Sequence, residues 1–304
     1  MNILLQIVQG FQWQTLINNQ TAFGHLFHSW LTILVVTIMV CFVVGELTRN
    51  YSQVDKIWSI MPIVYAMVTL FAFPTSPRIW LMTTLVTFWG LRLSYNFYRK
   101  GGYNVIPWKG EEDYRWNILR QHPKLQGFRI TLFNLLFISI YQQTLIMLFS
   151  TPLLLAAKNA EVGLSVLDIV AAGFMFLFIL IETIADNQLF NFHLQKQNKI
   201  TTDGKFTNSL QKGFMIDGLW KYVRHPNFAA EQLTWVSFYF FSVAASGQWL
   251  NWTLTGPVLL ILLFIGSSDF TESISKQKYP DYENYQEEVP RFLPFKLKSK
   301  QSDK

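Results

Sequence analysis

The sequence predicts an all-α, polytopic membrane protein with about seven transmembrane helices and a cytoplasmic C-terminus. Hydrophobic residues make up 51% of the 304 residues, and charged residues only 14%. A soluble helix needs one polar face, whereas a helix in lipid can be apolar almost all round. Seven apolar runs, each approaching the roughly 20 residues that cross a bilayer, are separated by segments that hold most of the charge. The composition therefore favours a bilayer as the solvent, and it excludes fibrous, collagen-like and wholly disordered proteins.

The apolar runs follow one another along the chain. They are Trp30–Leu47, Ile57–Phe73, Ile79–Tyr98, Ile130–Phe149, Leu164–Ala185, Ala229–Gly247 and Trp252–Phe270. We expect a single seven-helix membrane domain over residues 29–295 and a basic tail over 296–304. Residues 1–28 carry no Lys, Arg, Asp or Glu, so they lack the basic start of a signal peptide and are expected to form an interfacial segment.

The positions of the basic residues support an odd number of spans. If the chain starts outside, all but three of the 25 Lys and Arg residues lie in segments on one side of the membrane; the exceptions are Arg78, Arg92 and Lys158. This skew places those segments and the C-terminus in the cytoplasm. Because the basic residues form short blocks between apolar runs, the net charge of +6 indicates membrane lipids rather than nucleic acid as partners.

Cysteine and metal chemistry are not expected to carry the function. The one cysteine, Cys41, lies in the first apolar run, so no intrachain disulfide and no cysteine cluster can form. Glu182, Asp186 and His193 share a helical stripe, but without a matched second cluster they are a weak metal signature. We therefore predict no metal site.

Charged residues inside the runs are candidates for function, because each costs roughly 2.5–3.5 kcal/mol at the centre of a membrane helix unless it is paired or hydrated. Arg92 and Tyr95 share one face of the third run, although Arg92 could simply extend toward the inner surface. Glu182 and Asp186 lie one turn apart in the fifth helix and need a cation, a proton or a ligand hydroxyl between them. Neighbouring Arg or Lys could fill that need structurally.

The start of the sixth run has the features of an anion site. Pro226 can occupy the first helical turn, where backbone N–H groups face outward and attract negative charge. Arg224 and His225 precede it, and Asn227 and Glu231 follow on one face. A phosphate could therefore bind beside Arg224. Glu231 lies about one turn inside the bilayer and needs a partner, which could be a ligand or a salt bridge within the chain.

Two cytoplasmic loops mix acids, bases and aromatic residues. They are Glu111–Trp116, which includes Arg115, and Asp217–Tyr222. Arginine offers forked donors to phosphate, aromatic rings offer a face to a base, and carboxylates accept from ribose hydroxyls. Each loop could instead lie on lipid headgroups. Glu272 ends the seventh run, and we expect the tail beyond it to fold back if its aromatic residues are to be buried.

Several motifs, in one order along the chain, match a known family. They are Asn50, Ser52, Val54, Asp55 and Trp58; Trp89 to Leu93; Glu112 to Trp116; Ala185, Asp186 and Gln188; and Asp217 to Trp220, Tyr222, Arg224 to Asn227 and Glu231. This set resembles the bacterial membrane proteins grouped with the steroid 5-alpha-reductase C-terminal domain, the DUF1295 family. The resemblance extends from residue 45 to residue 295.

The resemblance implies a seven-helix, oxidoreductase-like protein of the bacterial inner membrane that holds NADPH from the cytoplasmic side and takes a hydrophobic, lipid-like or steroid-like substrate from the bilayer. Asp186, Asn227 and Glu231 match positions that line the dinucleotide or its pocket in steroid reductases, and Arg92 matches an Arg of their third span. With the clusters above, the predicted cofactor ligands are Arg92, Arg115, Asp186, Asp217, Tyr222, Arg224, His225, Asn227, Glu231 and Glu272. The expected chemistry is hydride transfer from nicotinamide to a carbonyl-conjugated double bond, while an acid hydrogen-bonds the carbonyl oxygen.

One part of the steroid-reductase pattern is missing. Those enzymes polarise the carbonyl with a Glu near the start of the second span and a Tyr in the third, whereas this chain has Ile60 and Trp89 at the aligned positions. Asp55 and Tyr95 are the nearest candidates for the catalytic acid. We therefore expect a substrate other than a 3-oxo steroid.

Two other functions compete with the reductase. Membrane methyltransferases of the isoprenylcysteine carboxyl and phospholipid types also carry Arg-His-Pro before a helix and a Tyr-x-x-Tyr then Pro tail, matched here by Tyr279, Tyr282 and Pro290. They have a Glu pair where this chain has Glu272 alone, and usually a Tyr where it has Phe228. An S-adenosylmethionine-dependent methyltransferase is thus the alternative, and a non-enzymatic lipid-binding membrane protein is the third possibility.

Overall fold

The computed structural model describes residues 21–106, 108–198 and 204–295. Every regular element in these ranges is a helix. The chain divides into two compact units, the first formed by the chain up to Met175 together with Trp235–Leu260, and the second by Phe176–Thr234 together with the chain from Ile261 onward. The sequence predicts one domain over residues 29–295, and each unit contains part of this range.

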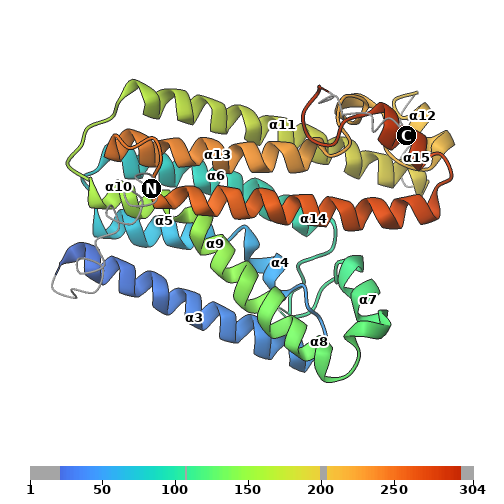
Figure 1. The fold of residues 1–304 in the computed structure, drawn as a ribbon, viewed down its shortest axis with the longest axis horizontal. Coiled ribbons are helices and arrows are strands. Elements are labelled where there is room, and N and C mark those ends of the chain that lie inside the picture. The colour runs from blue at the N-terminus through green and yellow to red at the C-terminus, as the bar shows by residue number, and fades with distance from the viewer. Residues whose placement is uncertain (1–20, 107, 199–203, 296–304) are drawn as a thin grey trace, which may run out of the picture. The chain divides into compact units, whose positions relative to one another are not determined.

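The first unit contains most of the helices. They are α3 (Ala22–Thr48), α4 (Gln53–Trp58), α5 (Met61–Ala72), α6 (Pro77–Arg99), α7 (Tyr114–Gln121), α8 (Phe128–Phe133), α9 (Gln142–Ser150) and α10 (Pro152–Lys158), with the 3-10 helices η1 (Pro123–Leu125) and η4 (Trp252–Leu254) and the π-helix η2 (Asn134–Tyr141). Within this unit α3 lies beside η2 and α9, and α5 lies beside α6 (Figure 1). Gly90 allows α6 to pack closely, because a Cβ there would meet the Ser59 carbonyl oxygen at 2.5 Å.

The second unit contains α12 (Thr207–Lys212), the 3-10 helix η3 (Gly218–Lys221) and α15 (Tyr282–Glu288). Three long helices run from one unit into the other, namely α11 (Val166–Lys196), α13 (Pro226–Ser246) and α14 (Thr255–Lys278). The expected position of Pro226 is confirmed, since α13 begins at this residue. Proline suits the first turn because the N–H that it lacks has no partner within the helix.

Within the described part of the chain, five helical segments are long and apolar enough to cross a membrane. They are Ala22–Thr48, Gln53–Ala72, Phe128–Ser150, Val166–Lys196 and Trp252–Lys278. These overlap five of the seven predicted runs. The other two runs form α6 and α13, whose 23 and 21 residues reach the length of a span, but residues such as Arg92 and Glu231 lower their hydropathy.

The predicted interfacial segment and basic tail are only partly described. Helix α3 begins at Ala22, where the Thr21 side chain accepts a hydrogen bond from the Gly24 amide, so residues 22–28 are helical and continuous with the first apolar run. Residues 1–20 of that segment and the basic tail 296–304 lie outside the described residues.

A fully buried ion pair holds one end of the first unit together. Arg78 and Asp168 are both 0% exposed, and their side chains form two hydrogen bonds of 2.7 and 2.9 Å. The remaining Arg78 donors reach the carbonyls of Val162 and Gly163, and the Asp168 carboxylate also accepts from Ser165. Because every charged atom has a partner, this pair can stay buried without an uncompensated charge.

We predict that Arg78→Met lowers the free energy of unfolding by about 3–5 kcal/mol, because Asp168 would remain buried without its partner. The double variant Arg78→Met/Asp168→Leu should recover most of this loss, since neither charge is then left alone. Denaturant titration in detergent micelles measures both, with the exposed Lys158→Met as the control. Equal losses in the single and double variants would contradict this account.

Candidate functional site

In the first unit, the loop after α6 and the start of α7 bond to the start of α4 and the residues before it. The hydrogen bonds include those from Asn50 Nδ2 to the Gly110 carbonyl at 3.1 Å, from the Tyr51 amide to Glu112 Oε1 at 2.7 Å, from the Asp113 amide to Ser52 Oγ at 2.9 Å, and from Trp116 Nε1 to Asp55 Oδ2 at 2.8 Å. Two motifs that lie about 60 residues apart in the sequence therefore form one structure.

The two predicted catalytic acids have different surroundings. Asp55 is half-buried and accepts the indole N–H of Trp116, so its carboxyl group has a defined orientation. Tyr95 is 62% exposed on α6, where the Arg99 guanidinium carbon lies 5.7 Å from the centre of its ring. Trp89 is fully buried and packs edge-on against Trp235, with the centres of the two rings 4.8 Å apart. Of these residues, Asp55 has the environment that best suits a positioned acid.

The charges beside Asp55 already have partners within the loop. Burial opposes ionisation of Asp113, but the Arg115 guanidinium, bonded at 2.8 and 2.9 Å, holds the pKa of Asp113 below its usual range. Burial also raises the pKa of Glu112, although this carboxyl group pairs with Arg120. Arg115 is a predicted cofactor ligand, yet its fork faces Asp113, so a phosphate would have to compete with that carboxylate.

The second unit buries three carboxylates on two helices. Glu182 and Asp186 on α11 and Glu231 on α13 are each 4% exposed. Asn227 Nδ2 donates to Asp186 Oδ1 over 3.3 Å and so links α13 to α11. A carboxylate accepts hydrogen bonds, so the amide nitrogen of Asn227 must face Asp186. The amide oxygen is buried and has no hydrogen-bond partner among the described residues.

Asp217 closes the loop that precedes η3. Its carboxylate accepts from the Ser209 hydroxyl at 2.7 Å, from the Ser209 amide at 3.0 Å and from Asn208 Nδ2 at 3.1 Å. Although Asp217 was predicted to hold the cofactor, its oxygens here shape the loop. Tyr222, another predicted ligand, is 63% exposed.

The next residues of the same motif fasten the loop to α11. Gly218 has φ 65°, and a Cβ there would come within 2.6 Å of the Gln188 side chain, so glycine is required both by conformation and by space. The Leu219 amide donates to Gln188 Oε1 at 2.9 Å. The motif therefore sets the path of the chain toward α13.

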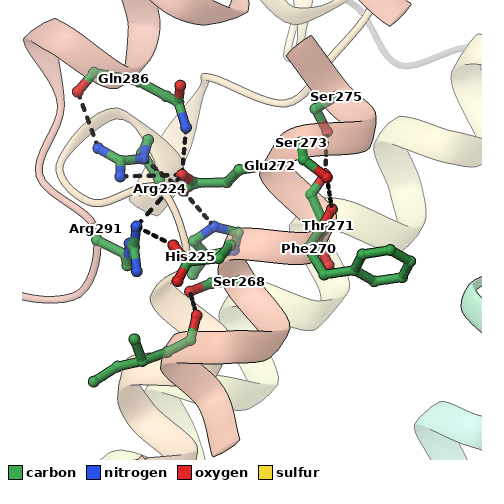
Figure 2. A network of polar contacts seen from close by, with 12 residues as sticks. Arg224, His225, Ser268, Phe270, Thr271, Glu272, Ser273, Ser275, Gln286 and Arg291 are labelled. Atoms are coloured by element: carbon green, nitrogen blue, oxygen red, sulfur yellow. Dashed lines mark hydrogen bonds and ion pairs between the residues drawn. The ribbon is translucent and has the colours of Figure 1, made fainter. Parts of the chain in front are cut away.

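Figure 2 shows the polar network around Glu272 on α14. Arg224 Nε donates to Glu272 Oε1 at 2.7 Å, and Arg224 Nη2 lies 3.3 Å from Oε2. His225 Nε2 lies 2.8 Å from the same Oε1, and Gln286 Nε2 donates to Oε2. The remaining Arg224 nitrogen donates to the carbonyls of Gln286 and Val289. All three Arg224 nitrogens are thus bound by the chain itself.

The tail beyond α14 folds back onto the Arg224-His225 segment, as the sequence predicts. The Arg224 amide donates to the Pro290 carbonyl at 2.9 Å, and the His225 amide to the Arg291 carbonyl at 3.1 Å. Three rings pack beneath this contact, those of Phe214, Tyr282 and Tyr285. Arg291 also pairs with Asp269 at 2.6 Å (Figure 2).

Three predicted cofactor ligands, Arg224, His225 and Glu272, contact one another in this network. Their contact with a nucleotide stays a prediction. A phosphate beside Arg224 would have to share its guanidinium group with the Glu272 carboxylate. Gln286 is a member of this group that the sequence analysis missed; its position next to the buried Tyr285 on a short helix is the one signal that could have shown it.

Arg92 belongs to the first unit, whereas Asp186, Arg224 and Glu231 belong to the second. Arg92 is half-buried on α6, and its meeting with the other three around one ligand stays a prediction. Across the described ranges, no group of three or more His, Cys, Asp or Glu residues is arranged to hold a metal ion.

Comparison with known proteins agrees with this set of motifs. The family model described as protein of unknown function (DUF1295) matches residues 41–289. The chain belongs to the DUF1295 family. A relative from Schizosaccharomyces pombe, described as an uncharacterized protein, is 38% identical over 281 residues, which cover 86% of this chain and 79% of the relative. This relative comes from a yeast, so the comparison does not support the bacterial inner membrane as the location. No solved structure matches this DUF1295 chain.

We predict that Glu272→Ala destabilises this DUF1295 protein by about 3–5 kcal/mol, because Arg224 would lose its buried partner. Hydrogen exchange should also become faster in residues 282–291, which the Glu272 network holds. The matched control is Glu283→Ala, whose carboxylate is 70% exposed and pairs with Lys276 at the surface, a pair expected to contribute about 0–1 kcal/mol. Unchanged exchange in Glu272→Ala would show that the tail is held by its aromatic residues alone.

Proposed function

We propose that this DUF1295 protein is a membrane-embedded, NADPH-dependent reductase of a lipid-like or steroid-like unsaturated carbonyl compound. The observation that supports it best is the buried group of acceptors on α11 and α13. Asp186 and Glu231 supply carboxylates, and the amide oxygen of Asn227 is buried without a partner among the described residues. A dinucleotide carries ribose hydroxyl and amide donors, which such acceptors can bind.

The residues present fit this cofactor in a defined way. Asp186, Asn227 and Glu231 would accept hydrogen bonds from the cofactor. Arg224, His225 and Glu272 would hold the first turn of α13 in place. Tyr222 has an exposed ring, and Arg92, Arg115 and Asp217 remain further proposed contacts. NADPH, when bound, supplies the hydride for reduction of the double bond.

The chain must also stabilise the charge that develops on the substrate carbonyl. Asp55 is the proposed acid, because its carboxyl group is oriented by the indole N–H of Trp116. A protonated Asp55 could donate a hydrogen bond to the carbonyl oxygen as an enolate forms. Tyr95 is the weaker proposal, since its side chain is exposed.

The proposed topology has seven spans, in which α6 and α13 join the five apolar helices. Both have the length to cross, and buried polar residues in a membrane helix often mark a functional site. The distribution of Lys and Arg supports a cytoplasmic C-terminus. The proposed cofactor would then enter from the cytoplasm and the substrate from the bilayer.

One observation favours a methyltransferase as the second candidate. Glu272, the Arg224-His225-Pro226 segment and the Tyr282 side of the tail lie together in the structure, and these are the elements that resemble the membrane methyltransferases. In that case the second unit would bind S-adenosylmethionine instead of NADPH.

Equilibrium titration of the purified protein in detergent separates these functions. We expect saturable binding of NADPH and none of S-adenosylmethionine. Asn227→Ala should weaken NADPH binding at least about tenfold, or about 1.4 kcal/mol, because it removes a buried acceptor. The matched control is Asn284→Ala, an exposed amide on α15 that should bind as the wild type does.

The other outcomes of this titration are equally decisive. Binding of S-adenosylmethionine alone would replace the reductase by the methyltransferase. If the protein binds neither compound, the non-enzymatic lipid-binding protein remains. Equal NADPH affinity in Asn227→Ala and the wild type would remove the α11–α13 face from the cofactor site.

A further inference from the structure

We propose that the loop after α6 carries an apolar tip that enters the headgroup layer of an anionic membrane. The tip consists of Val105, Ile106 and Trp108, which are 99%, 37% and 52% exposed. Three neighbouring apolar side chains on an irregular loop are unfavourable in water. In the headgroup layer they can leave water, and tryptophan is enriched there because its ring is apolar with one polar edge.

The tip is held by hydrogen bonds to its backbone, so its apolar side chains stay outside. Lys56 is 4% exposed, and its ammonium group donates to the Lys109 carbonyl at 2.8 Å. Gln53 Nε2 donates to the Trp108 carbonyl at 3.2 Å, and Tyr103 OH donates to the Lys56 carbonyl at 2.6 Å. Because a buried lysine donates its hydrogen bond to a carbonyl of the loop, we infer that a fixed loop position is important.

The same bonds fix the depth of the tip. Asn50, Gln53 and Lys56, which hold the loop, lie at the start of Gln53–Ala72, one of the five helices or helix pairs able to cross a membrane. The loop is therefore level with the end of a membrane span. The headgroup layer begins at this depth, since a span of about 20 residues covers only the hydrocarbon.

The charged residues beside the tip indicate the kind of lipid that it contacts. Lys100 and Lys109 are exposed on either side of the tip, and Glu111 follows as an exposed acid. Lysines at the membrane surface are attracted to anionic lipids. The occupant that fits both the apolar tip and its basic flanks is a phospholipid layer containing anionic headgroups.

This contact bears on the rest of the loop. The segment that begins with the tip continues into Glu112, Asp113 and Trp116, which bond to the start of α4 and to Asp55. Lipid contact at the tip would thus steady the partner of the proposed acid. The inference uses only the Gln53–Ala72 span and its hydrogen bonds, so it stands or falls separately from NADPH binding.

Spin labelling in nanodiscs tests the proposal. A label at Val105→Cys, in a background in which the buried Cys41 is changed to Ala, is placed in discs of phosphatidylcholine with or without phosphatidylglycerol. We expect the ratio of oxygen to nickel-chelate accessibility to be several-fold higher at residue 105 than at the control Glu111→Cys. The ratio should rise further with phosphatidylglycerol. Adding Lys56→Met should make the label more mobile and lower the ratio.

A second measurement uses the chain with its own cysteine. The fluorescence of Trp108 is the difference between the signals of the wild type and the Trp108→Phe variant, which separates it from that of the other tryptophans. Brominated lipids should quench this difference. A water-like ratio at residue 105 in both lipid compositions, together with no quenching of Trp108, would overturn the proposal. The exposed tip would then be a contact surface for another protein.

Discussion

The carboxylate of Glu272 is the contact on which the described arrangement of the second unit depends. It receives hydrogen bonds from Arg224, His225 and Gln286, which belong to the start of α13 and to the tail. All of this happens at a buried position, where a charge is tolerated only if it is paired and hydrogen-bonded. Three stretches of the chain must therefore come together for any one of them to be stable there.

This constraint gives the contiguous motif Arg224–Asn227 two separate tasks. Its first two residues face Glu272 and fix where α13 begins, and Pro226 starts the helix. Asn227 then lies one residue into α13, where its amide reaches Asp186. Glu231 follows one turn later and is buried as well. The hydrogen bonds at Glu272 thus fix where the helix face that we propose for the cofactor begins. They contribute no free donor to that face.

Hydrophobic periodicity and charge blocks were enough to predict the helical class, five apolar helical segments and the start of α13. They also located the unusual polar residues, because a charge in an apolar run is conspicuous in any sequence. They could not predict the partners of those charges. Arg78 and Asp168 are separated by 90 residues, and neither residue carries a local sign of the other. Arg224 looked like a phosphate ligand because its acceptor, Glu272, lies 48 residues away on another helix.

The partners that the sequence concealed also change what kind of ligand the chain can recognise. Four basic side chains have their partners within the chain: Arg78 bonds to Asp168, Arg115 to Asp113, Arg224 to Glu272, and Lys56 to a loop carbonyl. A phosphate would have to displace a carboxylate at three of these positions. The amide oxygen of Asn227, by contrast, is buried and has no hydrogen-bond partner among the described residues. In the cofactor site that we propose at the α11–α13 face, these acceptors would bind hydroxyl or amide donors of the ligand.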